Sequence, residues 1–516
     1  MEKPTAPVNI NVEKNYDSEF CGSIPLHLVN LVQPHGVLLV LDKQDLRILQ
    51  VSENVERFLF AKPDELLGLP FSDLLAEGQY EDILAKLHTQ DSQDKIPLTL
   101  RFQVQGRETA FSVLILPQQD YVLAELEESV DSPKESFVRL YQHIKYITSL
   151  LKQAGTYPEI AQRAAEELKQ FSGFDRVLVY QFDPKWNGIV IAQAKEEDMA
   201  DYLGLRFPAS DVPKQARDLY FRNPYRLIPT RDYKPVRLIP VLNPLTQRFT
   251  DLSESSLRSV ANVHLEYLAN MNITASMSLP IIIDGQLWGL ISCHHKTARY
   301  PGYEMRSAME LLSGILSAQL EAKQREEVMA LRVQLRSMHV KLVEQLYDAT
   351  HFADGLLKKG DSLKELLSLG GAAVVYEGNI WLSGDTPGKD EVRELASWLR
   401  RNKSGLFATS MLTHDYPHSK GYKEVASGLI AMPINAEQGD FILGFRPEVA
   451  KTIAWGGNPN NAVQMEPDGK SYHPRNSFAI YQETVKNTSQ PWSMEELEAA
   501  EKLRNAVLEK IVKERY

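Results

Sequence analysis

The chain has 516 residues, of which 43% are hydrophobic and 24% charged, and its net charge is −11 at pH 7. This length predicts about three domains, and the acidic balance argues against a binder of nucleic acid or of anionic membranes, because both select basic faces. Two cysteines, Cys21 and Cys293, are too few for a disulfide framework or a Cys-x-x-Cys zinc site, and no apolar run is long enough to cross a membrane, so we expect a cytoplasmic protein.

A small α+β domain is predicted to follow a flexible N-terminal segment, residues 1–20. Ser52 is a plausible N-cap for a helix from Glu53 to Phe60. The charged, proline-containing tract 127–135 is typical of a linker. Alternating apolar runs predict strands at 36–41, 46–51, 97–104 and 109–116.

A second domain is predicted to begin with helices at about 136–172, followed by strands at 176–182 and 188–194. The stretch 203–253 reads as a long irregular segment rich in proline and arginine, and loops of this length are usually functional. The domain closes with two apolar runs joined by Asp284-Gly285, a dipeptide that favours a type I′ hairpin turn.

One long helix is predicted over residues 303–348, because apolar residues recur there at spacings of three and four without a helix breaker. We favour an inter-domain spine or a helical homodimer contact over a helix that packs only on its own domain.

A third domain is predicted at about 350–495. Its apolar runs around 428–445 echo those of the earlier hairpin, which suggests that the second and third domains share a fold. Residues 455–476 are rich in glycine, asparagine and proline and predict an extended excursion. A last helix begins at Ser493 and reaches the final residue without a stop signal, so we expect the natural protein to continue.

Several motifs, in this order along the chain, are similar to those of one family, the bacteriophytochromes. They are Cys21 with Pro25–His27 and Gln33–Gly36, then Phe207–Pro213, Leu257–Leu268 and Trp288–His295, and finally Trp455–Gly457 with Pro474–Phe478. The resemblance implies an α+β architecture of three tandem domains (PAS, GAF and a GAF-like PHY) with antiparallel sheets, a long connecting helix, a figure-of-eight knot between PAS and GAF, and a PHY tongue. The implied bounds are 1–20 for the N-terminal segment, 21–130 for PAS, 131–320 for GAF, 303–348 for the connecting helix, 335–500 for PHY with its tongue at about 450–485, and 493–516 for a signalling helix.

The resemblance also implies a covalently bound linear tetrapyrrole. Phytochromes that attach their bilin in the GAF domain carry a cysteine directly before the pocket histidine, and here that position is Val263. Bacteriophytochromes use the N-terminal cysteine, whose place Cys21 takes, and this choice implies thioether-linked biliverdin. Cys293, in an apolar run, reads instead as a small buried hydrophobe.

The resemblance also assigns chromophore-binding roles to residues at matching positions of the family. Asp211, with Val212 and Pro213, and His264 resemble the residues that face the pyrrole nitrogens, although an aspartate before Val-Pro is otherwise a turn former. Arg226, Arg258, Tyr220, Ser276 and Ser278 resemble the partners of the two propionates. Surface salt bridges for the arginines and a solvent-facing strand for the serines are the plainer alternatives.

The last pyrrole ring needs a packed aromatic wall and one hydrogen-bond partner. His294 resembles that partner. A metal site at His294-His295 is disfavoured, because neighbouring strand residues point to opposite faces. The residues that resemble the aromatic wall are Tyr180, Tyr202, Phe207 and Tyr267.

Arg475 and Ser477 resemble the tongue residues that form a signalling latch with Asp211. Asn272 and Thr274 replace family glycines, which puts the geometry of their loop in question.

The resemblance implies a red/far-red photoreceptor in which biliverdin isomerises at its C15=C16 bond and the signal passes through the tongue and the helices to an output module. We expect that module to be a histidine kinase outside this chain, acting on a response regulator, and the chain itself to be no enzyme and to hold no metal. The alternative is a GAF/PAS sensor of a small molecule such as a cyclic nucleotide or haem, in which the Pro-Ala-Ser-Asp-Val-Pro and tongue motifs would have no purpose.

Overall fold

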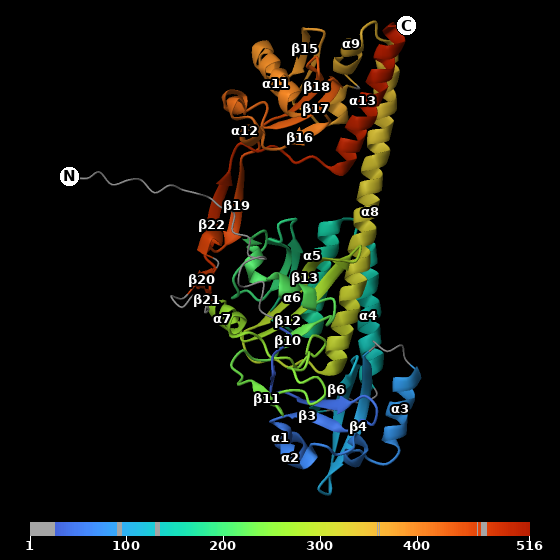
Figure 1. Cartoon of the computed structure of the whole chain (residues 1–516), viewed down its shortest axis with the longest axis vertical. Coiled ribbons are helices and arrows are strands. Elements are labelled where there is room, and N and C mark those ends of the chain that lie inside the picture. Colours follow the sequence, from blue (N-terminus) through green and yellow to red (C-terminus); the bar gives the residue numbers. More distant parts are fainter. Residues whose placement is uncertain are drawn as a thin grey trace, which may run out of the picture. The chain divides into compact units, whose positions relative to one another are not determined.

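The computed structural model describes residues 26–89, 95–128, 135–358, 360, 362–461, 463–465 and 472–515 (Figure 1). The predicted flexible segment and Cys21 lie outside these residues. The chain divides into two compact units, which are described separately: Met1–Glu321 with Ala454–Tyr481, and Ala322–Ile453 with Gln482–Tyr516.

The first region of unit one is built on a seven-stranded sheet with the order β1-β11-β3-β2-β6-β5-β4. One face buries a core with short helices, and the other buries Val32, Leu38 and Leu116 against the loop residues Leu252 and Leu257. Its strands are β1 (Leu31–Val32), β2 (Val37–Asp42), β3 (Ile48–Ser52), β4 (Ile96–Val104), β5 (Arg107–Pro117) and β6 (Tyr121–Glu128), and its helices are α1 (Val55–Leu59), α2 (Pro63–Leu66), the 3-10 turn Phe71–Leu74 and α3 (Gln79–Thr89). The four predicted strands are confirmed.

The predicted N-cap at Ser52 is wrong. Ser52 ends strand β3, and its hydroxyl accepts a hydrogen bond from the Leu38 amide at 3.1 Å. Helix α1 starts later, after Asn54, whose side-chain amide donates to the Gly36 carbonyl at 2.9 Å. A serine hydroxyl satisfies a strand amide as well as a helix amide, so the residue type alone did not locate the helix start.

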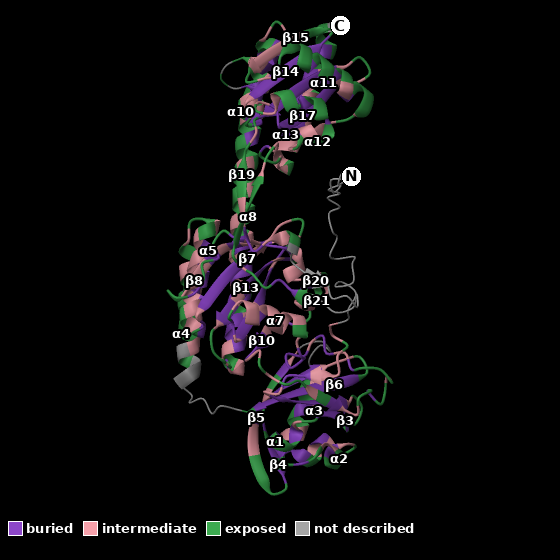
Figure 2. Cartoon of the chain, turned by 90° about the vertical axis from the view of Figure 1, so that its left-hand side faces the viewer, coloured by how far each residue is buried: buried purple, intermediate pink, exposed green. Residues whose placement is uncertain are grey.

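The second region of unit one carries the sheet order β10-β12-β13-β7-β8-β9. Helices α4 and α5 and the first part of α8 bury one face of this sheet, and Figure 2 shows its strands as largely buried. The strands are β7 (Arg176–Phe182), β8 (Gly188–Lys195), β9 (Arg206–Phe207), β10 (Arg226–Ile228), β12 (Ala275–Ile283) and β13 (Gln286–His295), and the helices are α4 (Glu135–Gln153), α5 (Tyr157–Ser172), the 3-10 turn η3 (Ala209–Asp211), α6 (Lys214–Leu219), α7 (Asn262–Asn270) and α8 (Tyr303–Asp348).

The predicted hairpin turn is confirmed, since Asp284 and Gly285 have φ values of 49° and 72°, the left-handed values that a type I′ turn requires. The stretch 203–253, predicted to be irregular, instead contains several short elements. One of them, β11 (Val236–Ile239), pairs with β1 and β3 and so joins the sheet of the first region. Three or four residues of strand are too short to show a period, which is why the pattern missed them.

Helix α8 is continuous over the predicted range. Its apolar stripe is divided between two cores, with Met309 and Leu316 in unit one and Leu335 and Leu342 in unit two. One helix thus contributes to the cores of both units, which confirms the predicted inter-domain spine and contradicts the alternative of a helix that packs only on its own domain.

Unit two contains a five-stranded sheet with the order β15-β14-β18-β17-β16. In chain order this is the same topology as β8-β7-β13-β12-β10 of unit one, which confirms the predicted shared fold. Its strands are β14 (Gly371–Tyr376), β15 (Asn379–Gly384), β16 (Phe407–Thr409), β17 (Gly428–Asn435) and β18 (Asp440–Arg446), and its helices are α9 (Phe352–Leu357), α10 (Leu363–Leu366), α11 (Lys389–Asn402), α12 (Leu412–Asp415), the 3-10 turn Pro417–Tyr422 and α13 (Met494–Arg515).

The predicted extended excursion contains short strands. β20 (Val463–Met465) pairs antiparallel with β21 (Tyr472–Pro474). β19 (Lys451–Gly456) lies parallel to β9 through Trp455 and Arg206, and β22 (Ile480–Val485) follows. Among the described residues, no helix is both long and apolar enough to span a lipid bilayer.

Candidate functional site

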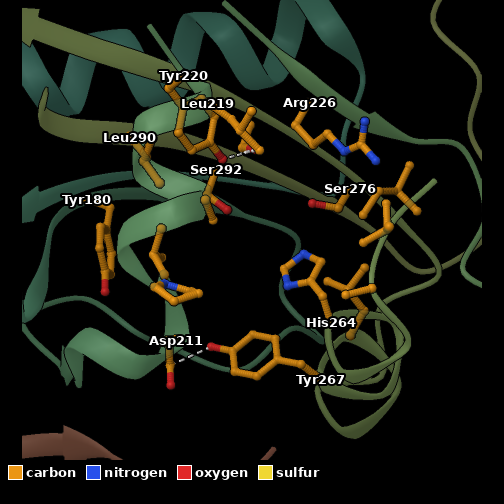
Figure 3. Close-up of a pocket in the computed structure, with 18 of the residues that line it drawn as sticks. Tyr180, Asp211, Leu219, Tyr220, Arg226, His264, Tyr267, Ser276, Leu290 and Ser292 are labelled. Carbon is orange, nitrogen blue, oxygen red and sulfur yellow. Dashed lines mark hydrogen bonds between the residues drawn. The ribbon is translucent and has the colours of Figure 1, made fainter. Parts of the chain in front are cut away.

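A pocket lies on the face of the second sheet opposite the α4, α5 and α8 core (Figure 3). Strands β7, β10, β12 and β13 form the floor of the pocket. The turn η3 and helices α6 and α7 form its sides. The structure brings together all of the predicted chromophore-binding residues in its lining: Tyr180, Tyr202, Phe207, Asp211, Val212, Pro213, Tyr220, Arg226, Arg258, His264, Tyr267, Ser276, Ser278 and His294.

Strand alternation creates this polar face. Ser276 and Ser278 line the pocket, whereas Met277 between them is fully buried in the opposite core. The solvent-facing alternative for the two serines is therefore wrong. Cys293 is buried in that same core, and burial raises the pKa of its thiol, so it behaves as the predicted small hydrophobe.

Two arginines form a cationic end of the pocket. The Arg226 guanidinium donates to the backbone carbonyls of Ser256 and Arg258, and Arg258 donates to the Leu26 carbonyl at 2.8 Å. Burial lowers the pKa of both, and the nearby Arg226 charge helps to bring the pKa of Arg258 to about 9. Neither has a carboxylate partner among the described residues, and the buried Nε of Arg258 has no hydrogen-bond partner there.

Hydroxyl groups lie beside the arginines. Tyr220 and Ser278 share a hydrogen bond of 2.7 Å, and Ser278 is the cross-strand neighbour of Arg226. One half-buried and one buried guanidinium group lie beside hydroxyls and have no carboxylate partner among the described residues, and this is the donor set that a ligand with carboxylates needs.

A buried ion pair closes another part of the pocket. Arg475 contacts the Asp211 carboxylate, and the two side chains are only 3% and 6% exposed. The Tyr267 hydroxyl donates to the same carboxylate at 2.8 Å, as the dashed line in Figure 3 shows. Burial raises the pKa of Asp211, and the charge of Arg475 and the Tyr267 hydroxyl oppose that rise. The Arg475 guanidinium also lies 4.6 Å from the centre of the Phe478 ring.

The third predicted member of the latch is Ser477. Ser477 is exposed, and its hydroxyl accepts a hydrogen bond from the Ala479 amide at 3.3 Å. No hydrogen bond from Ser477 to Asp211 or Arg475 is found among the described residues, so the latch role of Ser477 stays a prediction. A second contact of this segment joins His473 to Glu266 at 2.8 Å.

Aromatic side chains form the remaining wall. Phe207 lies 6.1 Å from Tyr180 and 5.5 Å from Tyr202, measured between ring centres. Gly188 makes this possible, because a Cβ there would lie within 2.0 Å of the Tyr180 ring. Sequence reasoning missed Gly188, since the need for a glycine depends on a ring eight residues away.

Burial favours the neutral form of the two pocket histidines, His264 and His294. Burial, followed by the charge of Arg226, lowers the pKa of His264 to about 4. His264 stacks on Tyr267 at 5.9 Å between ring centres. Burial also lowers the pKa of His294, and the charges of Arg176 and His264 add to this effect. Its neighbour His295 faces the other way and contacts Asp175 at 3.0 Å. No group of three metal-ligating side chains forms within the described part of the chain.

Two further residues of the site were not predicted. Ser292 lines the pocket beside His294, and the alternation of β13 could have found it. Arg176 contacts His294 from the neighbouring strand.

The geometry of the loop at Asn272 was left in question by the loss of a family glycine. The backbone at Asn272 is left-handed, with φ 57°, a conformation that asparagine tolerates better than most residues.

Comparisons with known proteins agree with this architecture. Residues 21–129 match the PAS fold, residues 157–322 the GAF domain and residues 335–516 the phytochrome region. Cyanobacterial phytochrome B of Nostoc sp. is 40% identical over 502 residues, which cover 97% of this chain and 67% of that protein. The chain thus spans about two thirds of the length of this relative.

Two solved structures are similar over nearly their whole length. A bacteriophytochrome of R. palustris matches with a TM-score of 0.85 at 36% identity, covering 96% of this chain and 99% of the other. The photosensory core module of the Stigmatella aurantiaca phytochrome matches with a TM-score of 0.83 at 36% identity, covering 96% and 98%. The fold, the pocket and these relatives together show that the chain belongs to the phytochrome family, with its PAS, GAF and PHY regions in tandem.

Proposed function

We propose that this chain is a red/far-red photoreceptor that holds biliverdin through a thioether to Cys21. Membership of the phytochrome family supports a bilin-binding light receptor. The observation that carries the proposal is the pair Arg226, half-buried, and Arg258, buried, which line the pocket without a carboxylate partner among the described residues. A pigment with two propionates would offset the cost of burying these charges.

The choice of biliverdin rests on which cysteine can reach the pocket. Val263 lines the pocket at the position where a GAF-attached bilin would need a thiol. Leu26 also lines it, and five residues of chain span at most about 17 Å. Cys21 is therefore within reach of a pigment in the pocket.

The bound pigment would supply the photochemistry, which is isomerisation at its C15=C16 bond in red light. Arg226, Arg258, Ser276 and Ser278 would hold the propionates. Asp211 and His264 would face the pyrrole nitrogens, with Val212 and Pro213 fixing the backbone of Asp211. The aromatic wall of Tyr180, Tyr202, Phe207 and Tyr267 would enclose the ring that turns.

Signal output would pass through the contact between Asp211 and Arg475, because a buried pair is costly to break and so ties the pocket to the segment that carries Arg475. We infer that this segment is the tongue, that residues around Val32 thread through the 227–257 loop, and that the helices carry the signal to a histidine kinase with a response regulator as its substrate. Exposed apolar residues on α8, Met329, Val333 and Val340, support a homodimer through this helix.

The test is an absorption spectrum of the chain expressed with biliverdin. We expect a coloured protein whose absorbance moves reversibly to longer wavelength after red light. A fully loaded protein that does not photoconvert would contradict the photoreceptor function. Loading of haem or a cyclic nucleotide in place of biliverdin would favour the small-molecule sensor.

Attachment has its own test. Wild-type protein should keep its pigment through acid denaturation, and Cys21→Ala should lose it. Cys293→Ala is the matched control, because that thiol is buried in the core, and it should keep the pigment. Retention by Cys21→Ala would refute the thioether and leave the photoreceptor proposal standing.

A further inference from the structure

Arg176 is a buried arginine whose position calls for an explanation. It is only 1% exposed, and it makes no ion pair with a carboxylate among the described residues. Taking a guanidinium out of water without an anion is costly. A protein that keeps such a residue gains something from the contacts that it makes.

Those contacts fix the guanidinium in one orientation. Arg176 and His294 are direct cross-strand neighbours on β7 and β13. Nη1 of Arg176 donates to the Ala200 carbonyl at 3.1 Å, and the guanidinium lies 4.2 Å from the centre of the Tyr202 ring. The remaining nitrogens face one atom, Nδ1 of His294, at 3.3 Å from Nε and 3.0 Å from Nη2.

A guanidinium has N–H donors and no acceptor. The ring nitrogen that it faces must therefore offer a lone pair, so Nδ1 of His294 carries no proton. A neutral imidazole has one N–H, which then lies on Nε2. Nε2 is 3.0 Å from the hydroxyl oxygen of Ser292, which also lines the pocket.

We propose that Arg176 is a positioning residue that holds His294 as the neutral Nε2–H tautomer, so that this wall of the pocket presents a hydrogen-bond donor and selects a carbonyl oxygen on the ligand. The idea that this carbonyl belongs to biliverdin rests on the proposed function, but the tautomer does not.

The charges around His294 act in the same direction. Arg176 on β7 and His264 on α7 face it, and both oppose a proton on its ring, in addition to the effect of burial on its pKa. The hydroxyl of Ser292 is uncharged and can accept from Nε2–H.

The test is nitrogen NMR of the ligand-free chain with ¹⁵N-labelled histidine, in which the ring signals of His294 are assigned by their loss in His294→Gln. We expect a protonated Nε2 and an unprotonated Nδ1 in the wild type. In Arg176→Met, which removes the donors, we expect signal from the Nδ1–H form and a higher pKa of the ring. Arg176→Lys keeps a donor and should retain the wild-type tautomer.

Arg206→Met is the matched control, because Arg206 lies in the same sheet but pairs with Asp183 at 3.2 Å; it should leave the His294 signals unchanged. A proton on Nδ1 in the wild type, or wild-type signals in a folded Arg176→Met, would overturn the proposal. The wild-type spectrum decides even if the variant does not fold.

The loaded protein gives an independent readout. With biliverdin bound, the vibrational band of the pigment carbonyl at this wall should shift to higher frequency in Arg176→Met as its hydrogen bond weakens, while Arg206→Met leaves it unchanged. A chain that takes up no biliverdin would refute the proposed function alone, because the tautomer is measured without pigment.

Discussion

The two sheets with the same strand order differ in what covers one face. In unit two, the connection between β15 and β16 contains α11, a 14-residue helix. Its apolar side packs on Leu429, Leu443 and Phe445 of the sheet. In unit one, the corresponding connection between β8 and β10 contains only β9, η3 and the six-residue α6.

The residues on this face of each sheet differ in the same way as the connection that covers it. Where unit two presents leucine and phenylalanine to α11, unit one presents Ser276, Ser278, Ser292 and His294 to the pocket. A covering helix and apolar strands make a core, and a short connection and polar strands make a binding site. The lesson is that one topology gives either result, so the fold alone does not establish a ligand.

The largest expected effect comes from replacing one arginine in each unit, Arg446 in unit two and Arg226 in unit one. In unit two, Arg446 contacts Glu496 and donates to the Leu367 carbonyl at 2.9 Å. Arg446→Met should lower the free energy of unfolding of that unit by about 3 kcal/mol, because it removes a buried cation and leaves the largely buried Glu496 carboxylate without its ion-pair partner. In unit one, Arg226→Met should change it by less than about 1 kcal/mol, since no carboxylate loses a partner and only hydrogen bonds to carbonyls are lost.

Hydrogen exchange measured segment by segment gives the free energy of unfolding of each unit separately. Arg226→Met should also weaken biliverdin binding by about 10- to 150-fold, the loss of one charge-assisted hydrogen bond of about 1.5–3 kcal/mol. Equal destabilisation of both units would mean that Arg226 has a structural partner after all.

Shortening a side chain on the face that α11 covers should lower the free energy of unfolding more than shortening one on the face that forms the pocket. Leu443 is fully buried under α11, and Leu443→Ala should lower the free energy of unfolding of unit two by about 2–5 kcal/mol. Ser292→Ala removes one hydroxyl from the pocket and should cost about 1 kcal/mol or less in unit one. Denaturant melts followed by hydrogen exchange measure both, and a large loss from Ser292→Ala would show that the pocket face is part of a core.

Acid should destabilise the pocket unit through its neutral histidines. The pKa of His264 is about 4 in the folded chain and that of His35 is also about 4, against 6.5 for a free histidine. Between these values the unfolded chain binds more protons, so the free energy of unfolding falls as the pH falls from 6.5 toward 4, by at most about 3 kcal/mol for each histidine.

Unfolding measured from pH 7.5 to 4.5 checks this dependence. His264→Gln should flatten the slope by the share of one histidine. A slope that is the same in wild type and His264→Gln would mean that folding does not lower the pKa of this ring.

The smallest effect tests how the first region supports the pocket. Glu125 of β6 accepts hydrogen bonds from the hydroxyls of Ser255 and Ser256 and from the Leu257 amide at 3.2 Å. It thus fixes the loop whose carbonyls receive Arg226. Glu125→Gln keeps the shape but loses one acceptor oxygen, and should weaken biliverdin binding by about fivefold, or about 1 kcal/mol.

The exposed Glu128 gives the matched control for this change. Glu128→Gln should bind biliverdin as the wild type does. Equal affinity in Glu125→Gln would show that the loop holds its place without the carboxylate.

Sequence patterns predicted the long elements well and the contacts between distant ones poorly. The strand 176–182 and the helix 303–348 were predicted to the residue, because each repeats a period many times. The short strand β11 and the start of α1 were not, since tertiary partners decide them. Pocket residues followed from family motifs, whereas Arg176 and Gly188 depend on a neighbouring strand or ring that no local pattern contains.

The contacts of the first described residues set an order on folding. The backbone N–H of Gln33 donates to the Leu257 carbonyl at 2.7 Å, and its side-chain amide donates to the Leu227 carbonyl at 3.0 Å. The backbone N–H of Ser259 donates to the Leu31 carbonyl. During synthesis these partners emerge more than 190 residues after Gln33, so Leu31 and Gln33 must wait for them until most of the GAF region exists. Closing contacts across such a separation is slow, and Leu31 and Gln33 are therefore among the last residues of this unit to reach their final hydrogen bonds.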